Sequence, residues 1–133
     1  MILVDTSVWI EYLRDNDHPV VLELDALIQD SADLATTEPI IMELLAGADT
    51  AQRERAITSL TNGLILLPVE PSLDYHAAAR LFVAARQMGR SIRSLNDCLI
   101  AAVAVRTRIP LLHKDRDFNE LAAVTSLRLH QPR

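Results

Sequence analysis

Short apolar segments that alternate with segments of helical periodicity constrain this fold more than any other feature. Apolar runs occupy residues 2–4, 34–35, 64–69 and 111–113, with 127–129 as a candidate fifth. Between them, helical spacing extends over residues 8–13, 20–28, 38–46, 50–61, 72–88, 94–104 and 118–122. Strands that alternate with helices predict a parallel sheet with helices on both faces. Because the strands are apolar throughout, we expect both faces of the sheet to be buried.

Length and composition favour one domain. The chain has 133 residues without a repeat or a Gly/Ser-rich linker, so we expect residues 1–133 to form a single domain. A lone cysteine, Cys98, excludes a disulfide framework and a cysteine-based zinc site. No apolar run approaches the roughly 20 residues of a membrane span, and the first residues lack the basic segment of a secretory signal. A soluble, cytoplasmic protein is the expectation.

The two halves of the chain differ in charge. Residues 1–74 contain 14 acids and 3 arginines, whereas residues 75–133 contain 4 acids and 10 bases. A solvated surface is the simpler reading of this asymmetry alone, but contact with nucleic acid also produces it. Twelve of the 13 bases are arginine, whose planar guanidinium binds phosphate oxygens in pairs. The candidate phosphate contacts are Arg86, Arg90, Arg93 and Lys114.

Carboxylates stand where a parallel sheet collects its site residues, beyond the carboxyl ends of the strands. Asp5 follows the first strand, Asp115 and Asp117 follow the fourth, and Asp97 lies in the first turn of a helix that Ser94 can cap. Taken singly, each of these aspartates fits an ordinary helix cap, and Thr6 or Ser7 can also cap the first helix. Glu43 fits less well, because its helix is mostly apolar. It is therefore either on a narrow exposed stripe or buried with a partner.

Taken together, the five carboxylates predict a divalent-cation site. Like charges a few ångströms apart disfavour joint ionisation, and a hard cation removes that conflict. Oxygen ligands suit Mg²⁺ or Mn²⁺, whereas the four histidines are scattered and lack the spacing of zinc ligands. A cation held in this way activates water toward a phosphorus centre. The acidic half would form the cation pocket, and the basic half would hold a phosphodiester backbone.

Four motifs occur in a fixed order along the chain. They are Ile2-Leu3-Val4-Asp5-Thr6-Ser7, Glu43 within an apolar helix, Asn96-Asp97-Cys98-Leu99-Ile100-Ala101-Ala102, and His113-Lys114-Asp115-Arg116-Asp117-Phe118. In order, spacing and total length the chain resembles the PIN-domain ribonucleases, and more narrowly the VapC toxins of bacterial VapBC toxin–antitoxin modules. The resemblance covers the whole chain.

The resemblance implies a three-layer α/β/α sandwich with a central, mostly parallel sheet of four to five strands, and cleavage of RNA that depends on Mg²⁺ or Mn²⁺. It places Asp5, Glu43, Asp97 and Asp115 at the family's catalytic, metal-binding acidic positions and Asp117 at a nearby metal-binding position. Thr6 or Ser7 takes the hydroxyl position that orients the first aspartate, and Asn96 supports the site. The implied partners are a VapB antitoxin, a second copy of the chain, and structured RNA such as tRNA or rRNA.

Two other kinds of protein stay open at this point. A phosphatase or phosphotransferase that forms an aspartyl-phosphate also places an aspartate after the first strand. It normally carries a second acid two residues later, where this chain has Ser7. A non-catalytic, partner-binding α/β domain is the other alternative. It would leave Glu43 and the isolated Asp97 unexplained.

Overall fold

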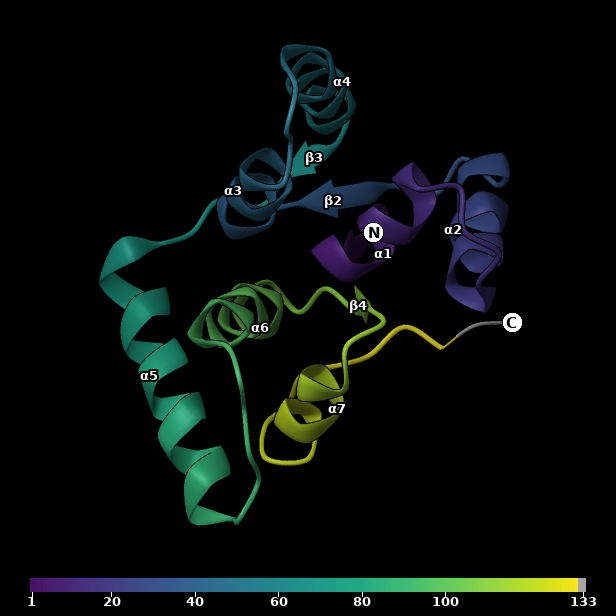
Figure 1. Ribbon diagram of the computed structural model, residues 1–133. Coiled ribbons are helices and arrows are strands. Elements are labelled where there is room, and N and C mark those ends of the chain that lie inside the picture. The colour runs from purple at the N-terminus through teal and green to yellow at the C-terminus, as the bar shows by residue number, and fades with distance from the viewer. Residues whose placement is uncertain (132–133) are drawn as a thin grey trace.

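The computed structural model describes residues 1–131. Within them, four short strands form one parallel sheet in the order β3-β2-β1-β4. The strands are β1 (Ile2–Val4), β2 (Leu34–Thr36), β3 (Ile65–Leu66) and β4 (Leu111–Leu112). The helices are α1 (Thr6–Leu13), α2 (Pro19–Gln29), α3 (Glu38–Ala46), α4 (Ala51–Asn62), α5 (Pro71–Gln87), α6 (Leu95–Thr107) and α7 (Arg116–Ala122), arranged as Figure 1 shows. The predicted three-layer α/β/α fold with a parallel sheet is confirmed.

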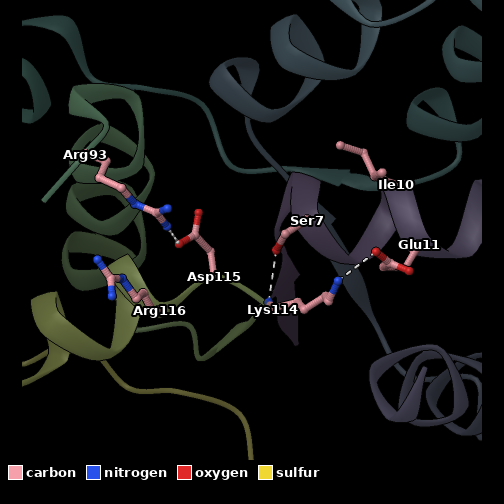
Figure 2. Close-up of a pocket in the computed structure, with 7 residues that line it drawn as sticks. All are labelled: Ser7, Ile10, Glu11, Arg93, Lys114, Asp115 and Arg116. Carbon is pink, nitrogen blue, oxygen red and sulfur yellow. Dashed lines mark hydrogen bonds and ion pairs between the residues drawn. The ribbon is translucent and has the colours of Figure 1, made fainter.

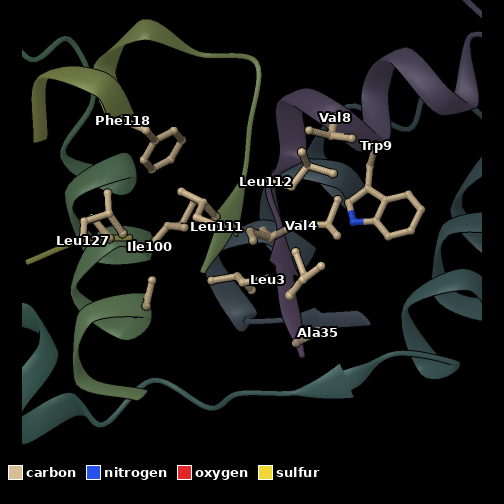
Figure 3. Packing of buried hydrophobic residues seen from close by; sticks show 14 of the residues in the cluster. Leu3, Val4, Val8, Trp9, Ala35, Ile100, Leu111, Leu112, Phe118 and Leu127 are labelled. Carbon is tan, nitrogen blue, oxygen red and sulfur yellow. The ribbon is translucent and has the colours of Figure 1, made fainter. Parts of the chain in front are cut away.

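The core forms on both faces of the two central strands, β1 and β4. Leu3 pairs with Leu111 and Val4 with Leu112, so each pair points to one face of the sheet. Figure 3 shows Ile100 and Phe118 packed on the side of Leu3 and Leu111, and Val8 and Trp9 on the side of Val4 and Leu112. The apolar composition of these strands follows from this two-sided burial.

The apolar run at residues 64–69 predicts a strand, and Pro68 places the end of this strand near the sheet edge. β3 does lie at the edge, but it is shorter and more exposed than predicted. Only Ile65 and Leu66 pair with β2, and their exposed fractions are 37% and 49%. Pro68 has no N–H to donate to a ladder. Beyond it, the N–H of Val69 donates to Glu38 Oε1 at 2.7 Å instead of to a strand. β3 is therefore a short edge strand, from which the chain turns away at the proline.

The candidate fifth strand at residues 127–129 is reduced to an isolated bridge. Leu129 pairs in parallel with Leu111, and the N–H of His130 donates to the carbonyl of Leu111 at 2.8 Å. This segment covers the outer edge of β4 without forming a strand of its own. Across the described residues, no helix is both long and apolar enough to cross a membrane.

α5 and α6 pack along each other, with α5 on the outside (Figure 1). Leu73 and His76, near the start of α5, are both exposed. The buried residues are Asp74, Ala78 and Ala85. Asp74 is accommodated there because Arg106 of α6 donates to both of its carboxylate oxygens, with Nε 2.9 Å from Oδ1 and Nη2 2.9 Å from Oδ2.

Candidate active site

The ends of β1 and β4 bring two of the predicted acids to one edge of the sheet. The N–H of Asp5 donates to the carbonyl of Leu112 at 3.0 Å, so the residues that follow the two strands start side by side. Asp5 is the N-cap of α1, and Asp115 is the N-cap of α7. The prediction that Thr6 or Ser7 caps the first helix is wrong, because the carboxylate of Asp5 itself accepts from the N–H of Ser7. Both acids thus have a capping role as well as a place at this edge.

Three carboxylates converge most closely. Asp97, Asp115 and Asp117 each offer an oxygen that lies within 4.8 Å of the oxygens of the other two. Asp97 enters from the first turn of α6, where its N–H donates to Oγ of the N-cap Ser94 at 3.3 Å. We call this set of three the acid cluster.

Burial and like charges make Asp97 the most perturbed acid of the site. Burial raises its pKa most, and the negative charges of Asp5, Asp115, Glu43 and Asp117 raise it further, to about 8. These charges act on Asp97 because all five predicted acids lie near one another. No cation forms an ion pair with Asp97 within residues 1–131.

Asp5 has one satisfied and one unsatisfied oxygen. Its Oδ2 accepts from the N–H and from Oγ of Ser7, at 2.9 and 2.6 Å. Its Oδ1 is buried and has no hydrogen-bond partner among the described residues. Burial dominates the pKa of Asp5 and raises it to about 6, although the hydrogen bonds from Ser7 lower it.

Glu43 is half-buried and has two hydrogen-bond partners. Of the two possibilities that the sequence left open, an exposed stripe or burial with a partner, the structure supports the second. Glu43 Oε1 accepts from Thr6 Oγ1 at 3.1 Å and from Asn96 Nδ2 at 2.8 Å. The two neighbouring hydroxyls therefore act on different acids, since Thr6 holds Glu43 and Ser7 holds Asp5. Asn96 links α6 to α3 through the same carboxylate, which places Glu43 beside Asp97.

The donor chemistry of this edge fits a hard divalent cation. All five acids offer oxygen, the three oxygens of the acid cluster are mutually close, and Asp5 Oδ1 has no competing donor. The nearby His113 is occupied, because its Nδ1 accepts from the N–H of Asp115 at 3.1 Å and its ring packs on Phe118. Burial lowers the pKa of His113. The site therefore suits Mg²⁺-type ligation more than zinc ligation.

The predicted phosphate contacts do not form one free basic face. Arg90 Nη1 contacts Glu120 Oε2 at 2.7 Å, and Lys114 Nζ contacts Glu11 Oε1 at 2.8 Å. Arg93 contacts Asp115 and Asp117 within the acid cluster. The guanidinium of Arg86 lies 5.6 Å from the centre of the Phe82 ring. Sequence spacing did not reveal the acidic partners of Arg90, Arg93 and Lys114, because these acids come from other elements of the fold. Phe82, by contrast, precedes Arg86 by one turn of α5.

A cleft adjoins the acid cluster and contains a cation that the sequence reading missed. It has a volume of about 310 Å³ and is lined by Ser7, Ile10, Glu11, Arg93, Lys114, Asp115 and Arg116 (Figure 2). Arg116 is exposed and forms no ion pair with any of the described residues. Ser7 Oγ accepts from the N–H of Lys114 at 3.0 Å while donating to Asp5, which ties the cleft to the acids. In the sequence, the feature that could have indicated Arg116 was its position between two candidate metal ligands, Asp115 and Asp117.

Comparison with known proteins agrees with this geometry. The PIN domain family profile matches residues 2–124. VapC ribonuclease Mb1587 of Mycobacterium bovis and ribonuclease VapC11 of Mycobacterium tuberculosis are each 42% identical over 128 residues, which cover 96% of this chain and 96% of each relative. The crystal structure of VapBC-5 from M. tuberculosis, a member of the VapBC family of toxin–antitoxin systems, has a TM-score of 0.66 at 27% identity and covers 97% of this chain and 96% of that one. The chain thus belongs to the PIN-domain family and, within it, to the VapC ribonucleases.

Proposed function

We propose that this chain is the toxin of a type II toxin–antitoxin pair and an endoribonuclease that depends on a divalent metal ion. The observation that carries the proposal is the acid cluster of Asp97, Asp115 and Asp117, with Asp5 and Glu43 beside it. PIN nucleases generally use a divalent metal, and the relatives that match nearly the whole chain are VapC ribonucleases. We infer that residues 1–133 act as one PIN domain, in the cytoplasm, where a VapC toxin meets cellular RNA.

Mg²⁺ or Mn²⁺ is the cation that the oxygen ligands favour. We assign Asp97, Asp115 and Asp117 as its principal ligands, with Asp5 and Glu43 completing the catalytic set. A divalent cation held there supplies Lewis acidity, which favours ionisation of the attacking water and offsets charge on the leaving oxygen. In the supporting shell, Ser7 orients Asp5, while Thr6 and Asn96 orient Glu43.

RNA would approach through the cleft beside the acid cluster. Lys114 and Arg116 line it, and Arg116 has no acidic partner within residues 1–131, so its guanidinium is free to contact a phosphate. Arg86 and Arg90, farther back toward the end of α5, are proposed as outer contacts. Contacts of this kind supply affinity without choosing a sequence. The substrate we propose is structured RNA of the tRNA or rRNA class.

The proposed partners are a VapB-type antitoxin and a second copy of this chain. VapBC-5, at 27% identity, belongs to a family of toxin–antitoxin systems. An antitoxin that covers the acidic pocket would keep RNA away from it. We expect expression of this chain alone to arrest growth, and co-expression of the antitoxin encoded beside it to restore growth.

The direct test is RNA cleavage by the purified full chain with Mn²⁺ or Mg²⁺. Asp97→Asn and Asp5→Asn should each lower the rate by at least about a hundredfold, because each removes a charge that the reaction centre needs. Asp49→Asn is the matched control, since Asp49 is an exposed acid paired with Arg53 away from the site. Circular dichroism should show all three variants folded. Cleavage that survives in folded Asp97→Asn, or in EDTA, would contradict the proposal.

A further inference from the structure

Arg93 lies directly on the acid cluster. Its Nη2 contacts Asp115 Oδ1 at 3.1 Å, and its Nε contacts Asp117 Oδ1 at 3.4 Å. Figure 2 shows the guanidinium directed at Asp115 across the wall of the cleft. Two of the three carboxylates proposed to hold the cation are therefore already partnered by a positive charge from the same chain.

The Arg93 side chain mainly adds positive charge to the acid cluster and does little to hold the carboxylates in position. Backbone donors fix the carboxylates, because the N–H of Arg93 donates to Asp117 Oδ2 and the N–H of Asp117 donates to Asp115 Oδ1, both at 3.0 Å. Neither bond involves the side chain at position 93. The side chain of Asp117 is 1% exposed, whereas that of Arg93 is 60% exposed, so the guanidinium is free to move out into solvent.

Arg93 and a bound metal ion would place two cations on the same oxygens. Asp115 Oδ1 already accepts from Arg93 Nη2 and from the N–H of Asp117. A divalent cation that uses this carboxylate must displace the guanidinium or lie next to it. Either outcome costs free energy, because the ion pair is lost or two positive charges are brought together.

We propose that Arg93 is a built-in counter-cation of the acid cluster, which stabilises the metal-free protein and competes with the divalent ion for Asp115. The inference rests on the proposed function only in requiring that the acid cluster binds metal. It gives Arg93 a different role from the phosphate contact that its sequence position indicated. It also explains how three close carboxylates are tolerated before metal arrives.

The test measures metal affinity rather than cleavage. Mn²⁺ is titrated calorimetrically into the full chain at low ionic strength, comparing wild type with Arg93→Gln and Arg93→Lys. Arg93→Gln should bind Mn²⁺ roughly two- to fivefold more tightly, the range that partly exposed ion pairs give. In EDTA the same variant should melt at a lower temperature than wild type. Arg93→Lys keeps a positive charge and should return both quantities toward wild type.

Arg90→Gln is the matched control, because Arg90 leaves the same loop but pairs with Glu120, outside the acid cluster. It should lower the melting temperature without changing Mn²⁺ affinity. Equal or weaker Mn²⁺ binding by folded Arg93→Gln would overturn the inference, and weaker binding would show that Arg93 positions the ligands instead. If wild type binds no Mn²⁺, the metal site fails together with the inference. If wild type binds Mn²⁺ and cleaves RNA but Arg93→Gln gains no affinity, only the inference fails.

Discussion

Asp74 and Asp97 are both buried aspartates in the first turn of a helix, yet their surroundings are opposite. Asp74, 1% exposed, accepts from Arg106 and from the N–H of Glu70. Asp97, 5% exposed, faces four other carboxylates and no cationic partner among the described residues. A buried acid whose oxygens are satisfied is what native structures normally contain. One surrounded by like charge costs stability, and such a residue is a candidate for a functional site.

Removing the charge of Asp74 tests the contribution of the paired aspartate to the stability of the fold. Asp74→Asn leaves Arg106 without its carboxylate, and the side chain of Arg106 is only 30% exposed. We expect the free energy of unfolding to fall by about 3 kcal/mol, measured by urea denaturation. Mn²⁺ affinity should stay at the wild-type value. A change in metal binding would mean that the two acids are not independent.

Metal binding tests the role of Asp97, the second aspartate of this comparison. A cation that binds only the folded chain should stabilise it by about 2.7 kcal/mol when its concentration is 100 times its Kd. The measurement is the urea midpoint with and without Mn²⁺. Asp97→Asn should lose most of this gain, whereas Asp49→Asn should keep it. If Mn²⁺ stabilised Asp97→Asn as much as wild type, Asp97 would not be a metal ligand.

The stability of the metal-free chain should also depend on pH. The pKa values of Asp5 and Asp97 are raised by burial to about 6 and about 8, so the folded state holds protons that the unfolded state has released above about pH 4. Stability should therefore fall as pH rises from about 4 to 8, and level off above that. Urea midpoints in EDTA at pH 5, 7 and 8.5 measure this. The fall should be shallower in Asp97→Asn, and an equal fall would assign the effect to other groups.

The smallest expected effect comes from the support of Glu43. Asn96→Ala removes the 2.8 Å hydrogen bond to Glu43 Oε1 but leaves the one from Thr6. Because residues that orient metal ligands typically contribute 10- to 100-fold to affinity, and one of the two donors remains, we expect Mn²⁺ to bind about tenfold more weakly. Calorimetric titration measures this, and unchanged affinity would place Glu43 outside the ligand set.

Much of the fold was predictable because local patterns and tertiary packing agree. The apolar run of β1, the helical spacing and the alternation of the two led to the parallel sheet. The length and burial of β3 were mispredicted, because an apolar run does not show where strand pairing ends. The extent of β3 was decided by Pro68 and by hydrogen bonds to α3 and α6.

The sequence singled out four of the proposed site acids because local structure sets their positions, at strand ends and in the first turns of helices. The fifth, Glu43, was singled out because it lies in an otherwise apolar helix. The ion pairs of Arg93 were not predicted, because spacing within its own segment does not reveal partners from another segment. The partners Asp115 and Asp117 are 22 and 24 residues away along the chain. Asp74 was not singled out at all, since its partner Arg106 is 32 residues away.

By itself, the sequence determined which residues form most of the strands and helices. It also determined that four carboxylates stand at the ends of such elements and that a fifth, Glu43, lies inside an apolar helix. Backbone periodicity and capping are local, so a linear pattern contains them. Tertiary structure alone decided which charges meet, including Arg93 with the acid cluster, Lys114 with Glu11, and Thr6 with Glu43. Electrostatic and hydrogen-bond energies depend on distances of a few ångströms between segments that are far apart along the chain. For this reason only the tertiary structure distinguishes Asp74, which is paired with Arg106, from Asp97, which we propose to be catalytic.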